Sequence, residues 1–322
     1  MPPTTQEKKQ RKTDPQFAHD VLTGLARSPK KLSSKYFYDE QGDKLFQDIM
    51  QMPEYYLTDC EYEIFETHRQ AILNTIGKKP FQLIELGAGD GYKTKVLLRH
   101  FLSQKADFQY RPIDISPNVL LELENDLKQD LPELRVESLT GDYFEMLDKL
   151  SADTKMRKVL LFIGANIGNL TREQAADFLK KLNQSMAKGD LLLIGFDLKK
   201  DPEIILQAYN DPAGITAEFN LNLLRRINRE LGANFDLKAF KHWETYNPAT
   251  GETKSYLVST RKQNVIIQGQ TILFDAWEAI DVELSQKYSL RETEELAESI
   301  GFKVVKHYFD HRNYFVDTFW KK

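Results

Sequence analysis

Cysteine is almost absent from this chain of 322 residues, which contains only Cys60. A single cysteine cannot form a disulfide within the chain, so the fold does not depend on an oxidising compartment. Residues 1–16 lack the apolar core of a secretory signal, and no run approaches the about 20 apolar residues that a membrane span requires. We therefore expect a cytoplasmic protein that does not enter a membrane.

Positive charge is not in surplus either. The 44 Lys and Arg residues are outnumbered by 48 Asp and Glu residues, and the formal net charge is −4. Binding to nucleic acid favours a basic face, whereas the only basic cluster lies among residues 8–12 and reads as part of a disordered tail, residues 1–13. The composition, 41% hydrophobic and 29% charged, is that of an ordinary globular protein. We expect a monomer that acts on a small molecule and has no nucleic-acid partner.

The two commonest glycine-rich nucleotide loops, Gly-x-Gly-x-x-Gly and Gly-Lys-Ser/Thr, do not fit the glycine-rich stretch of this chain. That stretch is Glu85-Leu86-Gly87-Ala88-Gly89-Asp90-Gly91, which follows an apolar run. Glycine lets the backbone approach a ligand where any Cβ would collide. An acid at the end of a strand suits a cationic amino-acid group, which points to S-adenosylmethionine with its positive methionyl amine. The same glycines also fit a tight strand-to-helix turn without a ligand.

Short apolar runs alternate with helix-like stretches through the middle of the chain. We predict strands at 81–87, 108–115, 135–141, 158–163 and 190–198, and helices at 94–102, 118–130 and 172–186. Such alternation implies a parallel sheet covered on both faces. Residues 302–309 and 314–320 read as an antiparallel hairpin. The predicted class is therefore α/β, a Rossmann-like class I S-adenosylmethionine methyltransferase sheet with a C-terminal antiparallel hairpin.

Two further segments do not fit that sheet. Residues 14–61 carry a short helix pattern and an aromatic cluster, and residues 199–289 carry an amphipathic helix at 217–231 followed by strand-like runs. We predict that these segments form a second, α+β substrate-binding domain at the carboxyl edge of the sheet, where open α/β folds bind ligands. The methyltransferase domain would then consist of residues 62–198 and 290–322.

Acidic residues follow the next two predicted strands. Asp114 can accept both ribose hydroxyls of the cofactor, although an aspartate at a helix N-terminus is stabilised without a ligand. In Gly141-Asp142-Tyr143-Phe144, Asp142 can take the adenine amino group and Phe144 can pack the ring, with a structural turn as the alternative. Lys93 is expected to line the glycine loop, or to be a solvated lysine on a helix.

The segment after the fourth predicted strand, Gly164-Ala165-Asn166-Ile167-Gly168-Asn169, faces the methyl group in this fold. Nucleobase N-methyltransferases carry Asn/Asp-Pro-Pro-aromatic here, which this chain lacks. The two asparagines offer amide donors and acceptors to a small polar substrate. No metal is expected, because His307 and His311 have a spacing that converges on a helix but lie in a predicted hairpin, where surface positions are expected.

Aromatic residues are concentrated in the N-terminal segment. Ring faces attract cations without requiring hydrogen bonds, so they can hold an amine that becomes a quaternary ammonium; about half of these rings must instead belong to the core. They are Tyr36, Phe37, Tyr38, Phe46, Tyr55 and Tyr56.

A group of dispersed motifs resembles the family of L-histidine Nα-methyltransferases of ergothioneine biosynthesis, in matching order and spacing from about residue 14 to the end. The motifs are Tyr36-Phe37-Tyr38-Asp39, Leu45-Phe46, Pro53-Glu54-Tyr55-Tyr56, Ile163-Gly164, Ile167-Gly168-Asn169-Leu170, Ala208-Tyr209, Gly214-Ile215-Thr216 and Ile227-Asn228-Arg229-Glu230-Leu231.

The resemblance implies a two-domain fold and three successive methyl transfers to the α-amine of histidine, giving the betaine hercynine. It also implies substrate contacts and a catalytic pair. Tyr38 would lie beside the reacting nitrogen and the cofactor, and Phe46 against the growing methylammonium. The amino-acid end would be held by Tyr55, Gly164, Asn169, Tyr209 and Thr216, and the cofactor by Glu85, Gly87, Lys93, Asp114, Asp142, Tyr143 and Phe144.

Specificity for the side chain would rest on a Glu and a Ser two residues apart, which the resemblance places at Glu283 and Ser285. Alternate residues of an extended segment face the same way, so both can reach one ring. A neutral imidazole has one N–H and one bare nitrogen, whereas an indole has only the N–H and would leave Ser285 without an acceptor. Ser255 stands where the family places a methionine against the ring, which leaves a roomier or wetter pocket wall.

The predicted function is trimethylation of the α-amine of L-histidine with S-adenosylmethionine as cofactor. Two alternatives remain open: a methyltransferase of another aromatic amino acid or amine such as tryptophan, and a noncatalytic S-adenosylmethionine-binding protein. A nucleic-acid or protein methyltransferase is disfavoured by the absent basic groove and the absent Pro-Pro-aromatic motif.

Overall fold

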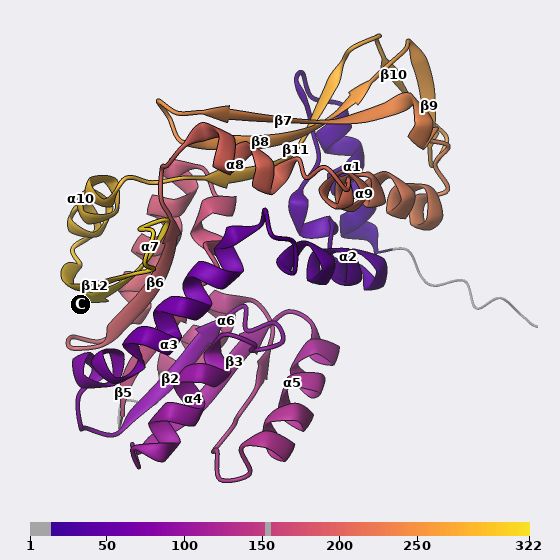
Figure 1. Ribbon diagram of the computed structural model, residues 1–322. Helices are drawn as coiled ribbons and strands as arrows, with labels where there is room; N and C mark the ends of the chain where they lie inside the picture. Colours follow the sequence, from indigo (N-terminus) through magenta and orange to yellow (C-terminus); the bar gives the residue numbers. More distant parts are fainter. Residues whose placement is uncertain (1–13, 152–155) are drawn as a thin grey trace, which may run out of the picture. The chain divides into compact units, whose positions relative to one another are not determined.

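The computed structural model describes residues 14–151 and 156–322 (Figure 1), so the predicted tail, residues 1–13, lies outside the described residues. The chain divides into two compact units, each described here by itself. Within the described residues, the smaller unit consists of residues 14–51, Tyr209–Thr245 and Lys254–Glu283, and the larger of Met52–Ala208, Tyr246–Thr253 and Leu284–Lys322.

The larger unit is built on a seven-stranded sheet in the order β12-β13-β6-β5-β2-β3-β4. Neighbouring strands from β6 to β4 are parallel, and β13 is antiparallel to both of its neighbours. This order confirms the predicted α/β methyltransferase sheet with its C-terminal antiparallel hairpin. The strands are β2 (Phe81–Leu86), β3 (Phe108–Asp114), β4 (Leu139–Thr140), β5 (Arg157–Phe162), β6 (Leu191–Asp197), β12 (Lys303–Phe309) and β13 (Phe315–Lys321).

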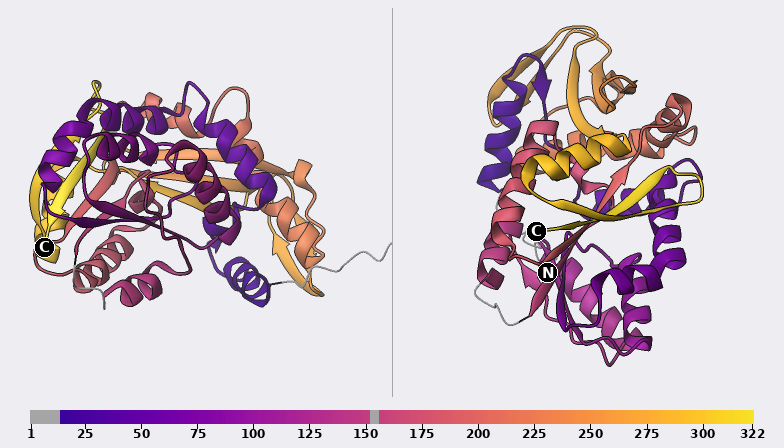
Figure 2. Two further views of the ribbon diagram at one scale, coloured as in Figure 1. Left: turned by 90° about the horizontal axis from the view of Figure 1, so that it is seen from below. Right: turned by 90° about the vertical axis from the view of Figure 1, so that its left-hand side faces the viewer.

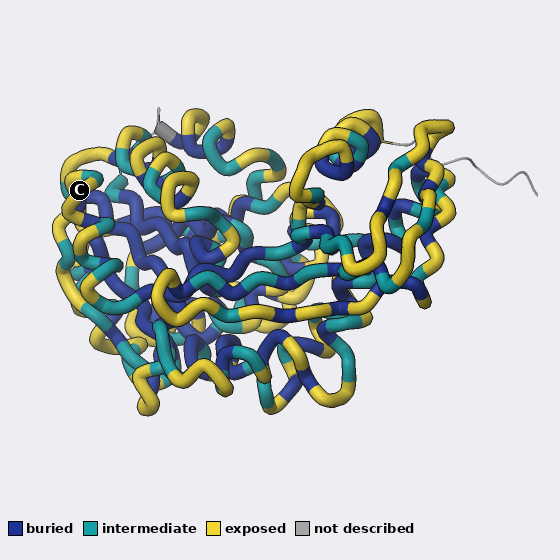
Figure 3. Tube along the Cα trace, turned by 90° about the horizontal axis from the view of Figure 1, so that it is seen from above, coloured by how far each residue is buried: buried dark blue, intermediate teal, exposed yellow. Residues whose placement is uncertain are grey.

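The central strands are buried on both faces, as a parallel sheet between two helical layers requires. Every residue of β2 and β6 is buried, and the tube in Figure 3 shows the sheet in dark blue beneath helices with exposed outer faces. Trp320 of β13 packs against Phe196 of β6, with ring centroids 5.7 Å apart. This apolar continuity explains why the alternation of short apolar runs was sufficient to predict the sheet.

The third predicted strand differs from the structure. Only Leu139–Thr140 forms β4, preceded by one isolated bridge between Tyr110 and Val136. This strand lies at the sheet edge and pairs only with β3, so few backbone contacts sustain it. Helix α6 (Tyr143–Ser151), which was not predicted, follows β4, and the Asp142 carboxylate caps it by accepting from the amides of Phe144 and Glu145.

Helices cover both faces of this sheet (Figures 1 and 2). On one side α3 packs against α4 and β13, and α5 packs against β3; on the other, α7 packs against α6 and α10. The predicted capping box at Thr171 and Gln174 is present, and Ser116 caps the helix that begins with Pro117. The helices are α3 (Tyr56–Ile76), α4 (Thr94–Ser103), α5 (Pro117–Asp130), α7 (Arg172–Ser185), α8 (Pro202–Tyr209) and α10 (Leu290–Ile300), with the short helix η2 (Asn166–Asn169).

The smaller unit combines helices with strands, as predicted for residues 14–61 and 199–289. Its four-stranded sheet has the order β1-β11-β8-β7, and β9 pairs with β10 as a hairpin. Helix α9 packs against α2. The elements are α1 (Pro15–Leu25), β1 (Lys30–Lys31), η1 (Ser34–Tyr36), α2 (Glu40–Met50), α9 (Ile215–Leu231), η3 (Leu237–Ala239), β7 (Phe240–Asn247), β8 (Glu252–Ser259), β9 (Gln263–Ile267), β10 (Gln270–Phe274) and β11 (Ala279–Gln286).

The unit boundaries differ from the predicted domain boundaries at four points, because residues 52–61, 199–208, 246–253 and 284–289 belong to the larger unit and not to the smaller one. Helix α3 begins before residue 62 but belongs to the larger unit, because it packs on α4 and β13. The last boundary falls within β11, between Glu283 and Leu284, rather than after residue 289. Among the helices in the described ranges 14–151 and 156–322, none is long and apolar enough to cross a bilayer.

Candidate functional site

The predicted cofactor residues lie at the carboxyl ends of neighbouring strands in the larger unit. Gly87 follows β2, Asp114 ends β3, and Gly141 and Asp142 follow β4. The strand order reverses between β2 and β5. Ligands of open α/β sheets bind outside the carboxyl ends of the strands at such a reversal. The topology thus brings together residues that are up to 55 positions apart in the sequence, from Gly87 to Asp142.

Gly87 forms a cradle that only glycine can provide. Its φ is +76°, and a Cβ built there would lie 2.7 Å from the Tyr143 hydroxyl. Gly89 also has a positive φ, +54°, but a Cβ there would meet nothing within 4 Å. The loop therefore presents bare backbone on an open side, which fits the close approach of a nucleoside and its amino-acid chain.

Three acidic groups surround Tyr143. Burial, then the nearby carboxylates of Asp114, Asp142 and Glu85, raises the pKa of the Tyr143 phenol to about 12. Asp114 accepts from the amides of Gly89, at 3.4 Å, and Ser116, at 3.0 Å. The Phe144 ring packs edge-on against Phe178 at 5.2 Å. Asp142 and Phe144 thus have structural roles in α6, and their cofactor roles stay predictions.

Glu85 is more enclosed than its predicted role suggests. It is 2% exposed, and its two oxygens accept from Thr94 Oγ1, at 2.7 Å, and from the Tyr110 hydroxyl. Burial raises its pKa to about 7, although both hydroxyls and Lys93 act in the opposite direction. This carboxylate ties the start of α4 to β3, and contact with the cofactor amine stays a prediction.

The turn after β5 carries Gly164, which has a φ of +75°. Its amide donates to the buried Glu61 carboxylate of α3 at 2.8 and 3.0 Å, and Lys93 forms an ion pair with the same carboxylate. A Cβ on Gly164 would lie 3.4 Å from Lys93 Nζ. Lys93, predicted as a cofactor residue, and Gly164, predicted as a substrate residue, therefore share one partner that the sequence argument missed.

The predicted contacts Asn169 and Ser285 are linked through Gly168. Asn169 ends η2 and is exposed, while the neighbouring Gly168 packs on the end of β11: a Cβ there would lie 3.0 Å from the carbonyl of Gln286 and 3.7 Å from Ser285 Oγ. Tyr55, at the start of α3, is half-buried. The segment after β5 and the end of β11 are thus neighbours within the larger unit.

A buried charge cluster supports Ser285. Lys287 Nζ donates to Ser285 Oγ at 2.8 Å and pairs with Asp197 at 2.7 Å, with both charged side chains 0% exposed. Burial opposes ionisation of Asp197, but Lys200 and Lys287 hold its pKa below the usual value. Because an ammonium group only donates, Ser285 Oγ is the acceptor in its bond with Lys287.

The smaller unit contains an aromatic cluster of Tyr38, Phe46 and Phe219. Their ring centroids are 5.5 Å (Tyr38–Phe46), 5.7 Å (Tyr38–Phe219) and 5.9 Å (Phe46–Phe219) apart. Phe219 was missed, although its place on the apolar face of the predicted helix was the available signal. Tyr38 is 46% exposed as a whole residue, while desolvation of its hydroxyl, followed by the carboxylates of Glu283 and Asp43, raises the pKa of the phenol above its usual value. Tyr38 is thus a neutral hydroxyl group at physiological pH.

Glu283 and Ser255 lie on neighbouring strands of the smaller unit, β11 and β8, and Ser255 Oγ donates to Glu283 Oε2 at 3.0 Å. Thr216 lies in the first turn of α9, and its amide donates to Asp211 at 2.8 Å. The carbonyl of Tyr209 accepts from His242 at 3.0 Å. These residues belong to the smaller unit, whereas Gly164, Asn169 and Ser285 belong to the larger.

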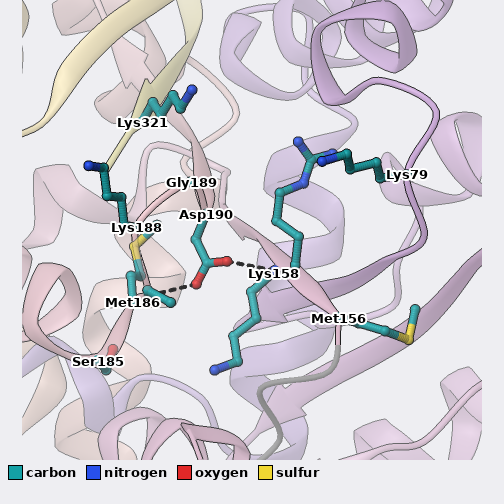
Figure 4. A pocket seen from close by; sticks show the side chains of 11 residues that line it. Lys79, Met156, Lys158, Ser185, Met186, Lys188, Gly189, Asp190 and Lys321 are labelled. Carbon is teal, nitrogen blue, oxygen red and sulfur yellow. Dashed lines mark hydrogen bonds between the residues drawn. The ribbon is translucent and has the colours of Figure 1, made fainter.

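A pocket of about 570 Å³ lies at the opposite, amino-terminal edge of the larger unit's sheet (Figure 4). Lys79, Arg157, Lys158, Lys188 and Lys321 line it, and the Asp190 carboxylate accepts from the amides of Lys158 and Ala187, both at 2.8 Å. None of the predicted site residues lines it. Its lysines point in different directions in Figure 4, so they form no common binding centre.

The predicted hairpin histidines have protein partners. His307 pairs with Glu294, and His311 lies against Glu63. In the described part of the chain, Glu63, Asp310 and His311 have ligand atoms close enough to hold a metal ion. However, Asp310 accepts from the amides of Arg312, Tyr314 and Phe315, which makes it the structural centre of the hairpin turn.

The strand order, the glycine cradle and the acids beside it define a class I S-adenosylmethionine-dependent methyltransferase. A family model described as histidine-specific, S-adenosylmethionine-dependent methyltransferase matches residues 17–322. The chain belongs to this family, and its cofactor is S-adenosylmethionine.

The chain is similar to several curated relatives, two of which carry different substrates in their names. It is 36% identical to the histidine N-alpha-methyltransferase of Mycobacterium tuberculosis over 84% of this chain and 83% of that one. It is 31% identical to ergothioneine biosynthesis protein 1 of Schizosaccharomyces pombe, over 86% of this chain and 37% of that one. Identity to the L-tryptophan methyltransferase of Psilocybe serbica is 26%, over 89% of this chain and 87% of that one.

Proposed function

We propose that this enzyme transfers three methyl groups to the α-amine of L-histidine, giving hercynine for ergothioneine biosynthesis. The observation that carries the proposal is the pair Glu283 and Ser285 on β11. The Glu283 carboxylate can accept the imidazole N–H, and the Ser285 hydroxyl can donate to the bare imidazole nitrogen. The identity of 36% to a relative named as a histidine N-alpha-methyltransferase supports the same substrate.

The partners of this pair assign each its role. Glu283 receives the Ser255 hydroxyl on Oε2, and a carboxylate has further lone pairs that accept the imidazole N–H. Ser285 accepts from Lys287, and a serine hydroxyl can also donate, which is the role that the bare imidazole nitrogen requires. An indole side chain satisfies Glu283 but offers the Ser285 hydroxyl no acceptor, and a buried site penalises a ligand that lacks a matching hydrogen-bonding group.

When bound, S-adenosylmethionine supplies an already activated methyl group. Gly87, Asp114, Asp142 and Tyr143 would hold it at the carboxyl edge of the sheet. The remaining task for the protein is to align a deprotonated amine with that methyl group. Tyr38, kept neutral by its raised pKa, orients the amine as a hydrogen-bond partner and is not a strong base.

The aromatic cluster has a matching role as the amine gains methyl groups. Each methylation removes an N–H that hydrogen bonds could otherwise hold, and the final quaternary ammonium has none. The faces of Tyr38, Phe46 and Phe219 can stabilise such a cation without hydrogen bonds. We therefore propose that this cluster holds the amine through all three transfers.

The second candidate substrate is tryptophan or a related aromatic amine. It is favoured by the departure at Ser255, a small buried residue in place of a methionine, and by the similarity to a tryptophan methyltransferase. The deciding experiment incubates the enzyme and S-adenosylmethionine separately with histidine and tryptophan and measures the products by mass spectrometry. Trimethylated histidine supports the proposal. Exclusive methylation of tryptophan favours the alternative, and no product with either amino acid favours a noncatalytic binding protein.

A further inference from the structure

A second buried carboxyl group lies beside Glu61, beneath the Gly164 turn of the larger unit. Asp317 is in β13 and is 0% exposed, as is Glu61. Asp317 pairs in register with Gly195 of β6. A Cβ on Gly195 would lie 2.5 Å from Glu61 Oε1, so the Glu61 carboxylate occupies the space that this glycine leaves beside Asp317.

The donors around these two carboxyl groups are unequally shared. Glu61 accepts the Gly164 amide at 2.8 and 3.0 Å and the Lys93 ammonium. Neither side-chain oxygen of Asp317 receives a hydrogen bond from an N–H or O–H donor within the described residues. Two buried carboxylates with one lysine would leave an unpaired negative charge, which costs far more in a protein interior than in water.

One proton resolves this imbalance. If Asp317 is protonated, its O–H donates to Glu61, both groups are satisfied, and Glu61 and Lys93 form a neutral pair. Burial and the charge of Glu61 raise the pKa of Asp317 well above its usual value, against the smaller effect of Lys93. The other nearby carboxylate is Glu85, which is electrostatically coupled to both Glu61 and Lys93.

We propose that Asp317 and Glu61 share one proton as a buried acid pair, and that this pair positions the Gly164 turn for methyl transfer. Glu61 connects the two halves of the larger unit's site, because one carboxylate holds both the Gly164 amide and the Lys93 ammonium. Asp317 restricts that carboxylate to a single orientation. Both are positioning residues, and the role assigned to Gly164 rests on the proposed function.

The first experiment tests the shared proton and does not depend on the substrate. Infrared difference spectroscopy compares wild type with Asp317→Asn, over a pH series around neutrality, in the absence of substrate. A buried carboxylic-acid C=O band that is lost in the variant supports the pair. Appearance of only a carboxylate band in the same difference spectrum would overturn it.

The second experiment tests positioning through kcat for histidine methylation. Asn keeps an N–H donor toward Glu61, so Asp317→Asn should retain kcat within about three-fold, whereas Asp317→Leu lacks a donor and should lose about ten-fold or more. Glu61→Gln keeps an acceptor for the Gly164 amide but loses the charge that holds Lys93. It should therefore lower kcat about as much as Asp317→Leu does. Equal losses in the Asn and Leu variants of Asp317, or no loss in Asp317→Leu, would contradict the proposal.

Asp190→Asn is the matched control for buried-carboxylate loss. Asp190 is 3% exposed and also bonds backbone amides, but at the opposite edge of the same sheet. Its substitution should lower Tm without changing kcat at a temperature where the protein is folded. If histidine is not methylated at all, the proposed function fails while the infrared result still decides the acid pair.

Discussion

Ser255 Oγ donates a hydrogen bond to Glu283 Oε2 at 3.0 Å, between neighbouring strands of the smaller unit. This bond fixes the carboxylate proposed to read the imidazole N–H. We predict that Ser255→Ala weakens histidine binding about two- to ten-fold, which is the usual net value of one hydrogen bond. Calorimetry should show the loss for histidine and an unchanged Kd for S-adenosylmethionine.

Ser259→Ala is the matched control for this prediction. Ser259 lies at the end of the same strand, is 0% exposed, and donates to the Arg261 carbonyl at 2.8 Å instead of to a predicted site residue. This variant should keep the wild-type histidine Kd. Equal weakening in both variants would mean that the effect comes from damage to β8 and not from Glu283.

The substitution Glu283→Gln tests the side-chain reader itself. Glutamine can still accept through its carbonyl oxygen, but it loses the charge and brings an NH2 group toward the imidazole. We predict about a ten-fold or greater loss of histidine affinity, consistent with removal of a charged hydrogen bond. Tryptophan binding should change less, so the ratio of the two Kd values is the measured quantity. Unchanged histidine binding would place the imidazole elsewhere.

Tyr38 should act on turnover and not on affinity. Tyr38→Phe keeps the ring against Phe46 and Phe219 and removes only the hydroxyl. If the hydroxyl orients the amine in the transition state, kcat falls about ten-fold while the histidine Kd stays within about two-fold. Single-turnover kinetics and equilibrium binding measure these separately. Comparable losses in kcat and in histidine affinity would show that the Tyr38 hydroxyl contributes to substrate binding and not specifically to the transition state.

The fold was predictable because its evidence is local. Apolar runs of strand length, the capping residues Ser116 and Thr171, and the glycines after β2 each specify structure within a few neighbours. The edge strand β4 and helix α6 were the exceptions. The first depends on pairing with a single neighbour, and the second on a capping carboxylate that the sequence also offered as a ligand.

The supporting residues of the site were not predictable for the opposite reason. Glu61 meets Gly164 across 103 positions, and Asp317 meets the space at Gly195 only through strand register. No spacing rule connects such residues, because tertiary packing decides which buried groups share a proton or an ion pair. The residues expected to face a ligand lie in recognisable sequence motifs. The residues that support them, such as Glu61 and Asp317, lie in no such motif.

Phe219 gives a prediction about the number of methyl groups transferred. It is 2% exposed and completes the aromatic cluster with Tyr38 and Phe46. Phe219→Leu preserves apolar volume but removes a ring face, which is worth about 0.5–2 kcal/mol to a bound cation. We expect mono- and dimethylated histidine to accumulate in mass spectra, because the later, more cationic products are held less well. Phe235→Leu, a change in another aromatic contact of the same unit, should give fully methylated product. Accumulation of mono- and dimethylated histidine in both variants would mean that the loss of either ring loosens the packing of the unit, without a specific role for Phe219.

Glu85 links stability and cofactor binding to pH. Its pKa is about 7 in the folded protein against the usual 4.5 of a glutamate, so between these pH values the folded state holds a proton that the unfolded state lacks. Stability must therefore fall as pH rises through this window, by on the order of 2 kcal/mol relative to Glu85→Gln, which cannot ionise. Denaturant unfolding of both proteins from about pH 5 to pH 8 measures the difference.

A cation beside Glu85 would stabilise its ionised form and so offset the free-energy cost of ionising this buried carboxyl group. If the methionyl amine of S-adenosylmethionine contacts this carboxylate, binding favours the ionised form, and cofactor affinity increases as pH rises through about 7. Glu85→Gln should abolish the increase, and adenosine, which lacks the amine, should not show it with either protein. Identical pH dependence of S-adenosylmethionine binding in wild type and Glu85→Gln would leave Glu85 with its bonds to Thr94 and Tyr110 as its whole role.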